Sequence, residues 1–154
     1  MTEADGSKFE GSFENGVMTG EGVYSWKNGN LYKGTFLDDK MHGKGSYTWA
    51  DKNSYVGDFV SDLMSGKGTY TWANGNVYVG DFKDDVMSGK GTFTWKNGNI
   101  FEGLFNKGQR NGKGSVKMAN GDLYEGEFNN NVEAGQGTYT WASGNKYVGD
   151  FKDS

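Results

Sequence analysis

The chain of 154 residues contains no cysteine, no proline and few aliphatic side chains. Without cysteine it has no disulfide, no cysteine-ligated zinc and no thiol catalysis. Hydrophobic residues make up 34% of the chain and aromatic residues alone 16%, so nearly half of the apolar residues are rings. Domains of this length normally bury Leu, Ile and Val. The composition therefore argues against a two-layer core, while the many rings argue against disorder.

Long apolar runs are also missing. The first twenty residues hold no apolar segment of the kind found in signal peptides, and no stretch approaches the roughly 20 apolar residues that span a bilayer. The net charge of −4 argues against nonspecific binding to nucleic acid or anionic lipid. We therefore expect a cytoplasmic protein that binds no nucleic acid. A position peripheral to a membrane or to the cytoskeleton stays open.

A 23-residue repeat runs through the chain. Residues 32–36 read YKGTF, and the pattern returns at 55–59, 78–82, 124–128 and 147–151, with Phe leading at 9–13 and 101–105. A second pattern, GKGSYTW at residues 43–49, follows in phase. Residues 1–154 thus hold six full repeats and the first strand of a seventh, which we expect to form one repeat array.

Each repeat has the pattern of one β-hairpin. Aromatic residues and glycines lie two apart, as in a strand, and the Asn-Gly and Ser-Gly turn signals between them leave no room for a helix. A three-residue loop ending in a left-handed Gly29 pairs Tyr24 with Tyr32. A two-residue loop at residues 39–40 pairs Tyr32 with Tyr47. The sequence therefore predicts an all-β fold, an elongated single-layer antiparallel meander of about 13 strands.

The two faces of this sheet differ in chemistry. One carries a trough of glycines flanked by Tyr and Phe, so rings can lie over the glycines and rescue weak strand positions. The opposite face is polar, and the pattern places Asp58 opposite Lys67 and Asp81 opposite Lys90. We interpret these pairs as cross-strand salt bridges.

The repeat resembles a known family. Residues 55–76 read YVGDFVSDLMSGKGTYTWANGN, which is similar to the MORN (membrane occupation and recognition nexus) repeat, and the likeness covers the whole chain. The resemblance implies a scaffold for protein interaction, with dimerisation common and phosphoinositide binding frequently proposed.

Several positions depart from the family pattern. Lys52 replaces the turn glycine, and Val116 and Met118 replace two rings of the fifth repeat. The hairpin position where the family often has a basic residue keeps one only at Arg110. In the first four repeats this position carries Met18, Met41, Met64 and Met87. These methionines argue against a basic, lipid-facing rim.

Catalytic chemistry has no counterpart in the repeat. His42, the only histidine, lies where the repeat supplies no base or nucleophile partner, and no nucleophile, base and orienting group recur together. The paired aspartates of the turns lack the spaced oxygen ligands of calcium loops. We therefore expect no enzyme, no cofactor and no metal site.

The aromatic face is the candidate binding site. We hypothesise a protein-interaction scaffold that binds a partner helix or extended segment along the aromatic and methionine-lined trough. A peripheral membrane or phosphoinositide-binding module is the alternative. The predicted partner-binding residues are Met18, Met41, Met64, Met87, Phe36, Phe59, Phe82, Tyr32, Tyr55, Tyr78, Trp26, Trp49, Trp72 and Trp95.

The two end strands of the array, residues 9–13 and 147–151, leave an unpaired edge each, with no proline to protect it. Tyr147 and Phe151 line the last of these edges. We therefore predict a homodimer or an end-to-end association through a terminal repeat.

Overall fold

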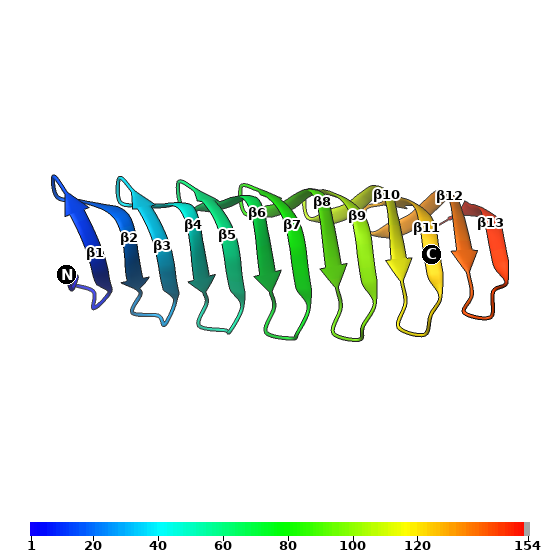
Figure 1. Ribbon diagram of the computed structural model, residues 1–154, viewed down its shortest axis with the longest axis horizontal. Coiled ribbons are helices and arrows are strands. Elements are labelled where there is room, and N and C mark those ends of the chain that lie inside the picture. Colours follow the sequence, from blue (N-terminus) through cyan, green and yellow to red (C-terminus); the bar gives the residue numbers. More distant parts are fainter. Residues whose placement is uncertain (153–154) are drawn as a thin grey trace. The chain divides into compact units, whose positions relative to one another are not determined.

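The computed structural model describes residues 1–152, and in that range it contains strands and no helix. Thirteen antiparallel strands form one open meander, in which each strand follows its predecessor in the sheet (Figure 1). The strands are β1 (Lys8–Glu14), β2 (Val17–Ser25), β3 (Leu31–Leu37), β4 (Lys40–Thr48), β5 (Ser54–Val60), β6 (Leu63–Thr71), β7 (Val77–Lys83), β8 (Val86–Thr94), β9 (Ile100–Asn106), β10 (Gln109–Lys117), β11 (Leu123–Asn129), β12 (Val132–Thr140) and β13 (Lys146–Phe151).

The contacts divide the chain into two compact units. The first unit comprises Met1–Ala73 and Phe82–Asp85, and the second comprises Asn74–Asp81 and the described residues from Val86 onward.

The three-residue loops have the predicted geometry. After β2, the Trp26 N–H donates to the Asn30 carbonyl at 3.0 Å, and the Gly29 N–H donates to the Trp26 carbonyl at 3.0 Å. Gly29 has a φ of 93°, which glycine adopts without strain. Tyr24 is the partner of Tyr32 across β2 and β3, so the predicted register is confirmed.

Lys52 takes the place of glycine in the next such loop, with a φ of 72°. A side chain with a Cβ is strained there by about 1 kcal/mol. Lys52→Gly is therefore expected to raise the free energy of unfolding by about 1 kcal/mol, measured by urea denaturation. Lys27→Gly is the control, because Lys27 is in the same kind of loop but has no positive φ. A urea midpoint of Lys52→Gly that equals or lies below that of the unchanged chain would contradict backbone strain at Lys52.

The two-residue turns differ from the prediction by one position. The turn after β3 is Asp38-Asp39, with φ values of 50° and 64°, which is typical of a type I′ hairpin. Phe36 is then the partner of Met41, and a β-bulge restores the pairing of Gly34 with Gly45. The turn predicted at residues 39–40 is wrong. The twist of the strands favours a type I′ turn at Asp38-Asp39, and the bulge takes up the two extra residues that this turn leaves on β4.

The core is a buried layer of rings lying over the glycine trough. Tyr32 and Tyr55 are fully buried, at 0% exposed. The Tyr32 hydroxyl donates to the Thr35 carbonyl at 2.9 Å, and its ring meets Phe36 and Phe59 edge to face at 5.1 Å each. The second unit repeats this arrangement from Tyr78–Phe105 to Phe101–Phe128, at 5.0 Å in both pairs. Edge-to-face rings and glycine backbone together replace a second layer.

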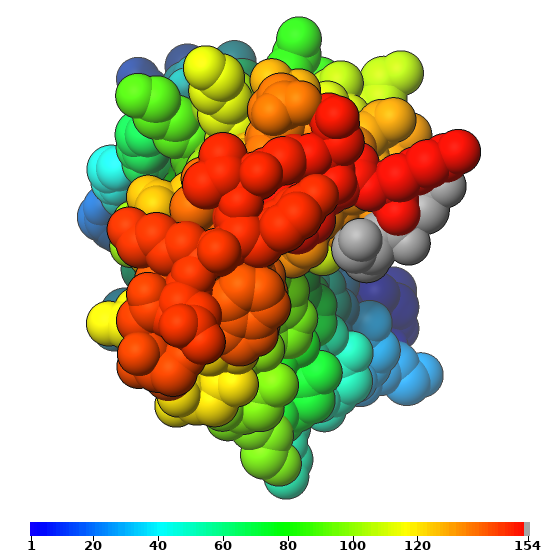
Figure 2. All heavy atoms as spheres, turned by 90° about the vertical axis from the view of Figure 1, so that its right-hand side faces the viewer, coloured from blue at the N-terminus to red at the C-terminus, as the bar shows by residue number. Residues whose placement is uncertain are grey.

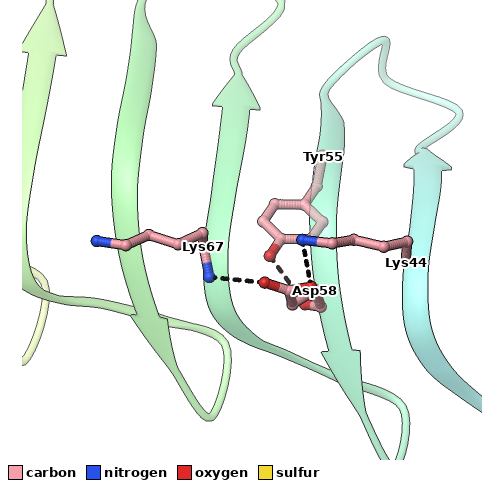
Figure 3. Close-up of polar contacts among 4 residues, drawn as sticks. All are labelled: Lys44, Tyr55, Asp58 and Lys67. Carbon is pink, nitrogen blue, oxygen red and sulfur yellow. Dashed lines mark hydrogen bonds and ion pairs between the residues drawn. The ribbon is translucent and has the colours of Figure 1, made fainter.

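On the polar face, Asp58 pairs with a different lysine from the one predicted. Its carboxylate lies 2.6 Å from the Lys44 Nζ, and it accepts the backbone N–H of Lys67 at 3.0 Å, while the Lys67 side chain points elsewhere (Figure 3). The Lys44 ammonium holds the pKa of Asp58 below its usual range. The predicted Asp58–Lys67 salt bridge is wrong because the register shift between β5 and β6 turns the lysine amide toward the carboxylate.

Side chains at both ends of the hairpins tie each repeat to the next. The Asp39 carboxylate accepts the Met18 N–H at 2.7 Å, and the Asn30 amide oxygen accepts the Ala50 N–H at 3.0 Å. Equivalent bonds recur down the chain, from Asp62 to Met41, Asp85 to Met64, Asn53 to Ala73, Asn76 to Lys96 and Asn99 to Ala119. The aspartates of the turns are thus structural hydrogen-bond acceptors.

The two edge strands differ from each other. Residues before β1 fold back on it, because the Phe9 N–H donates to the Met1 carbonyl at 2.9 Å and Thr2 forms a bridge with Lys8. The prediction of an unprotected first edge is therefore wrong. β13 is the last strand of the sheet and lies nearest the viewer in Figure 2, and its Tyr147 is 44% exposed.

Candidate functional site

A second set of rings lies on the same face as the buried layer. In the first unit, the Trp26 ring lies 4.5 Å from Tyr24 and 5.1 Å from Tyr47, and Trp49 lies 4.5 Å from Tyr47. The series continues from Trp49 to Tyr70 at 5.3 Å and from Tyr70 to Trp72 at 4.5 Å. We call these six rings the aromatic ladder: Tyr24, Trp26, Tyr47, Trp49, Tyr70 and Trp72.

The tryptophans of the ladder are less deeply buried than the tyrosines of the trough. Trp26, Trp49 and Trp72 are half-buried, in contrast to the fully buried tyrosines of the trough. The Tyr47 hydroxyl accepts a hydrogen bond from the Asn30 amide at 2.9 Å, and burial raises the pKa of Tyr47. The ladder therefore offers ring surface to solvent at fixed positions.

In the second unit, two non-aromatic residues interrupt the corresponding rings. Phe93 contacts Trp95 and Tyr139 contacts Trp141, at 4.8 Å in both pairs. Between these pairs, repeat five offers Val116 and Met118. The Tyr139 hydroxyl donates to the Asp122 carboxylate at 2.8 Å, which is the counterpart of the bond between Tyr47 and Asn30 in the first unit. The unbroken six-ring surface described above belongs to the first unit.

The methionines lie opposite phenylalanines at the other border of the aromatic face. Met18, Met41 and Met64 are the strand partners of Phe13, Phe36 and Phe59. Met18 and Met64 are 9% and 8% exposed, and Met41 and Met87 are half-buried. We call Met18, Met41 and Met64 of the first unit the methionine rim, and Met87 has the same position in a repeat of the second unit.

At the same position, repeats five and six carry a charged pair. The Arg110 guanidinium lies over the rings of Trp95, Phe101 and Phe128, at 5.4, 5.5 and 5.1 Å. Burial lowers the pKa of Arg110 and raises that of Glu133, and the charge of each group opposes the shift of the other. Sequence reasoning singled out Arg110 but missed Glu133, although both occupy the methionine column.

The predicted partner-binding residues fall into two depths. Tyr32, Tyr55 and Tyr78 are fully buried, and Phe36, Phe59 and Phe82 are at most 5% exposed. Trp26, Trp49, Trp72 and Trp95 are half-buried. The Tyr and Phe rings thus support the surface from below, and an occupant could touch the tryptophans and the methionine rim. That these residues bind a partner stays a prediction.

The sequence pattern is that of a known repeat family. The MORN repeat model matches residues 9–31, 32–54, 55–77, 78–100, 101–123 and 124–146. The chain belongs to the MORN repeat family. No curated protein sequence is significantly similar to it.

One solved domain is similar to the MORN chain in fold, and a second match is weaker. The TCP domain of Drosophila melanogaster SAS-4, in complex with a proline-rich motif of Ana2, is 15% identical with a TM-score of 0.55; the match covers 96% of this chain and 75% of that one. The TCP10 domain of Danio rerio CPAP, in complex with a STIL peptide, is 11% identical with a TM-score of 0.35, over 99% and 91% of the two chains.

The MORN repeats described here hold no cluster suited to a metal ion, since within residues 1–152 no three His, Cys, Asp or Glu side chains come together in that way. Among the same residues, no helix is long and apolar enough to cross a membrane.

Proposed function

We propose that this chain is a non-catalytic protein-interaction scaffold that binds an extended or helical segment of a partner protein on its aromatic face. The observation that carries the proposal is the aromatic ladder, six rings in contact above a fully buried layer, five of which are half-buried. Repeated, partly exposed aromatic surface is typical of binding interfaces. MORN repeats are binding domains without catalytic activity, which supports the same conclusion.

The fold likeness supports a protein segment as the ligand. The SAS-4 TCP domain, similar in fold to this chain, was solved with a proline-rich motif of Ana2. We propose that the occupant of this chain lies across the strands, against the tryptophans on one side and the methionine rim on the other. Methionine is flexible and polarisable, so it adapts to apolar side chains of a partner. A cytoplasmic location, free or beside the cytoskeleton, is part of this proposal.

A self-association belongs to the same proposal. β13 ends the sheet, and Tyr147 is 44% exposed. Unpaired edge strands invite pairing with another chain. We propose a homodimer or an end-to-end contact through Tyr147 and Phe151.

The experiment begins with peptides of 16 residues, selected from a displayed library on the full chain. Met41→Glu, Met64→Glu and Met87→Glu, combined, should weaken the selected peptides at least about tenfold, because three carboxylates then border an apolar surface. Glu133 occupies this column at half burial, so a glutamate side chain fits the position in one repeat. The measurement is calorimetric titration, with circular dichroism as a check of folding.

The matched control adds three carboxylates to the opposite face. Val56→Glu, Val79→Glu and Val148→Glu change side chains that are 59%, 51% and 73% exposed, and binding should be retained. If the peptides no longer bind this control variant but still bind the methionine variant, the aromatic face is not the binding site. Binding to phosphoinositide vesicles that falls steeply with salt would instead favour a peripheral membrane module.

A further inference from the structure

The aromatic ladder of the first unit presents the same two rings once in every repeat. Each repeat contributes two strands, and strands lie about 4.8 Å apart, so equivalent rings recur about every 9.6 Å. The alternating ring separations of 4.5 Å within a repeat and 5.1 Å to the next agree with this spacing. A bound segment that runs along the ladder meets the same chemistry at that period.

The period distinguishes the conformations that a bound segment can have. A polyproline II helix advances about 3.1 Å per residue with three residues per turn, or about 9.3 Å per turn. The turns of a polyproline II helix therefore depart from the positions of the ladder rings by less than about 1 Å over three repeats. In an α-helix the same 9.6 Å is about 6.4 residues, so its contact side turns away by about 80° per repeat. In a β-strand it is about 2.9 residues, and the side chains alternate between faces.

The ladder also has the chemistry that this conformation requires. Polyproline II backbone carbonyls have no internal donors. Within residues 1–152, the indole N–H groups of Trp26 and Trp49 make no hydrogen bond, and no side-chain nitrogen or oxygen is buried without a partner. These two indole groups therefore reach solvent and can donate to an occupant. The rings are tilted by 38° to 48°, so neighbouring faces are not stacked flat against each other.

The charges beside the ladder point to the same class of ligand. The loops at its border carry Lys27, Asp51 and Lys52, all exposed, and their charges nearly cancel. Such a border complements a segment that is rich in proline and poor in charge, and it gives little attraction to a strongly acidic or basic one.

We propose that the aromatic ladder binds a polyproline II segment with a proline at every third residue, one turn for each MORN repeat. This proposal rests on the proposed function and specifies its partner. Each proline ring packs against one Trp of the ladder, and intervening carbonyls accept the indole N–H groups. The ladder thereby selects both the conformation and the register of the partner.

Three synthetic 13-residue peptides test the proposal on the full chain. The first has prolines at every third position, the second has the same composition with its prolines clustered, and the third is an amphipathic helix without proline. Calorimetric titration should show the first binding at least about tenfold tighter than the other two. Equal binding of the first two, or no binding of the first, would overturn the proposal.

Variants locate the binding surface. Trp49→Ala should weaken the period-three peptide at least about tenfold, and Trp49→Phe, which keeps a ring but removes the N–H, should weaken it less. Circular dichroism checks that both variants fold. Trp141→Ala in the second unit is the control and should bind as the unchanged chain does. An effect of Trp141→Ala equal to that of Trp49→Ala would overturn the assignment to the ladder.

The two proposals fail in different ways. The selected peptides could lose binding in the methionine variant and yet have no proline at every third residue. That result would support the proposed function and reject the polyproline II segment. A library that yields no peptide for the aromatic face would reject the proposed function itself.

Discussion

Gly45→Ala is expected to lower the free energy of unfolding by about 3 kcal/mol or more, the upper end of what overpacking costs. A Cβ at Gly45 would lie 2.5 Å from the Cε2 and Oη atoms of Tyr32. That ring cannot move aside, because its hydroxyl is bonded to the Thr35 carbonyl at 2.9 Å and its faces and edges contact Phe36 and Phe59. Urea denaturation followed by tryptophan fluorescence measures the loss.

The matched control for this prediction is Gly20→Ala. Gly20 has open space around it and a φ of 69°, so alanine there suffers only the left-handed backbone, about 1 kcal/mol. A Gly45→Ala loss no larger than the Gly20→Ala loss would mean that the ring does not need the glycine trough.

The fold is expected to lose stability steeply in alkali, between pH 10 and 12. Burial raises the pKa of Tyr32 and Tyr55 to about 12, and it raises that of Tyr78 further. In the unfolded chain these phenols ionise near pH 10. Each raised pKa therefore contributes stability that is complete below pH 10 and is lost as the pH rises through the folded value. The loss should exceed about 1 kcal/mol for each buried phenol by pH 12.

Thermal unfolding between pH 8 and 12 measures this effect, and Tyr55→Phe is its control. Phe9 and Phe101 occupy the same position in two repeats and are fully buried, so the site accepts a ring without a hydroxyl. Tyr55→Phe should reduce the fall of the melting temperature between pH 10 and 12. A pH profile that is flat up to pH 12 in the unchanged chain would contradict the burial of the phenols.

The aromatic face combines a rigid layer with a more adaptable one. The trough rings are locked by glycine backbone and by edge-to-face neighbours, whereas the tryptophans and the methionine rim lie closer to solvent. Arg110 and Glu133 mark the second unit as different, because a guanidinium over three rings replaces a thioether. A partner segment that met this pair would need polar groups there.

The sequence by itself determined the strands, the glycine trough and the family. A period of two and a repeat of 23 residues allow one alignment in which all rings share a face, so the pairings of Tyr24 with Tyr32 and of Tyr32 with Tyr47 could be derived from local pattern alone. The left-handed backbone at Lys52 followed in the same way, since every equivalent loop has glycine there.

Only the tertiary structure decided what depends on backbone twist and on depth. The turns at Asp38-Asp39 and Ser61-Asp62 each need a compensating bulge, and the bulge between β5 and β6 leaves Asp58 paired with Lys44 and bonded to the backbone N–H of Lys67. Alternation tells which face a ring occupies but not how far it stands from the sheet, and so it could not separate the buried Tyr32 from the half-exposed Trp26. The electrostatic interaction of Arg110 with Glu133 also required the three-dimensional structure, because side chains 23 residues apart come near each other only when successive hairpins lie side by side in a sheet.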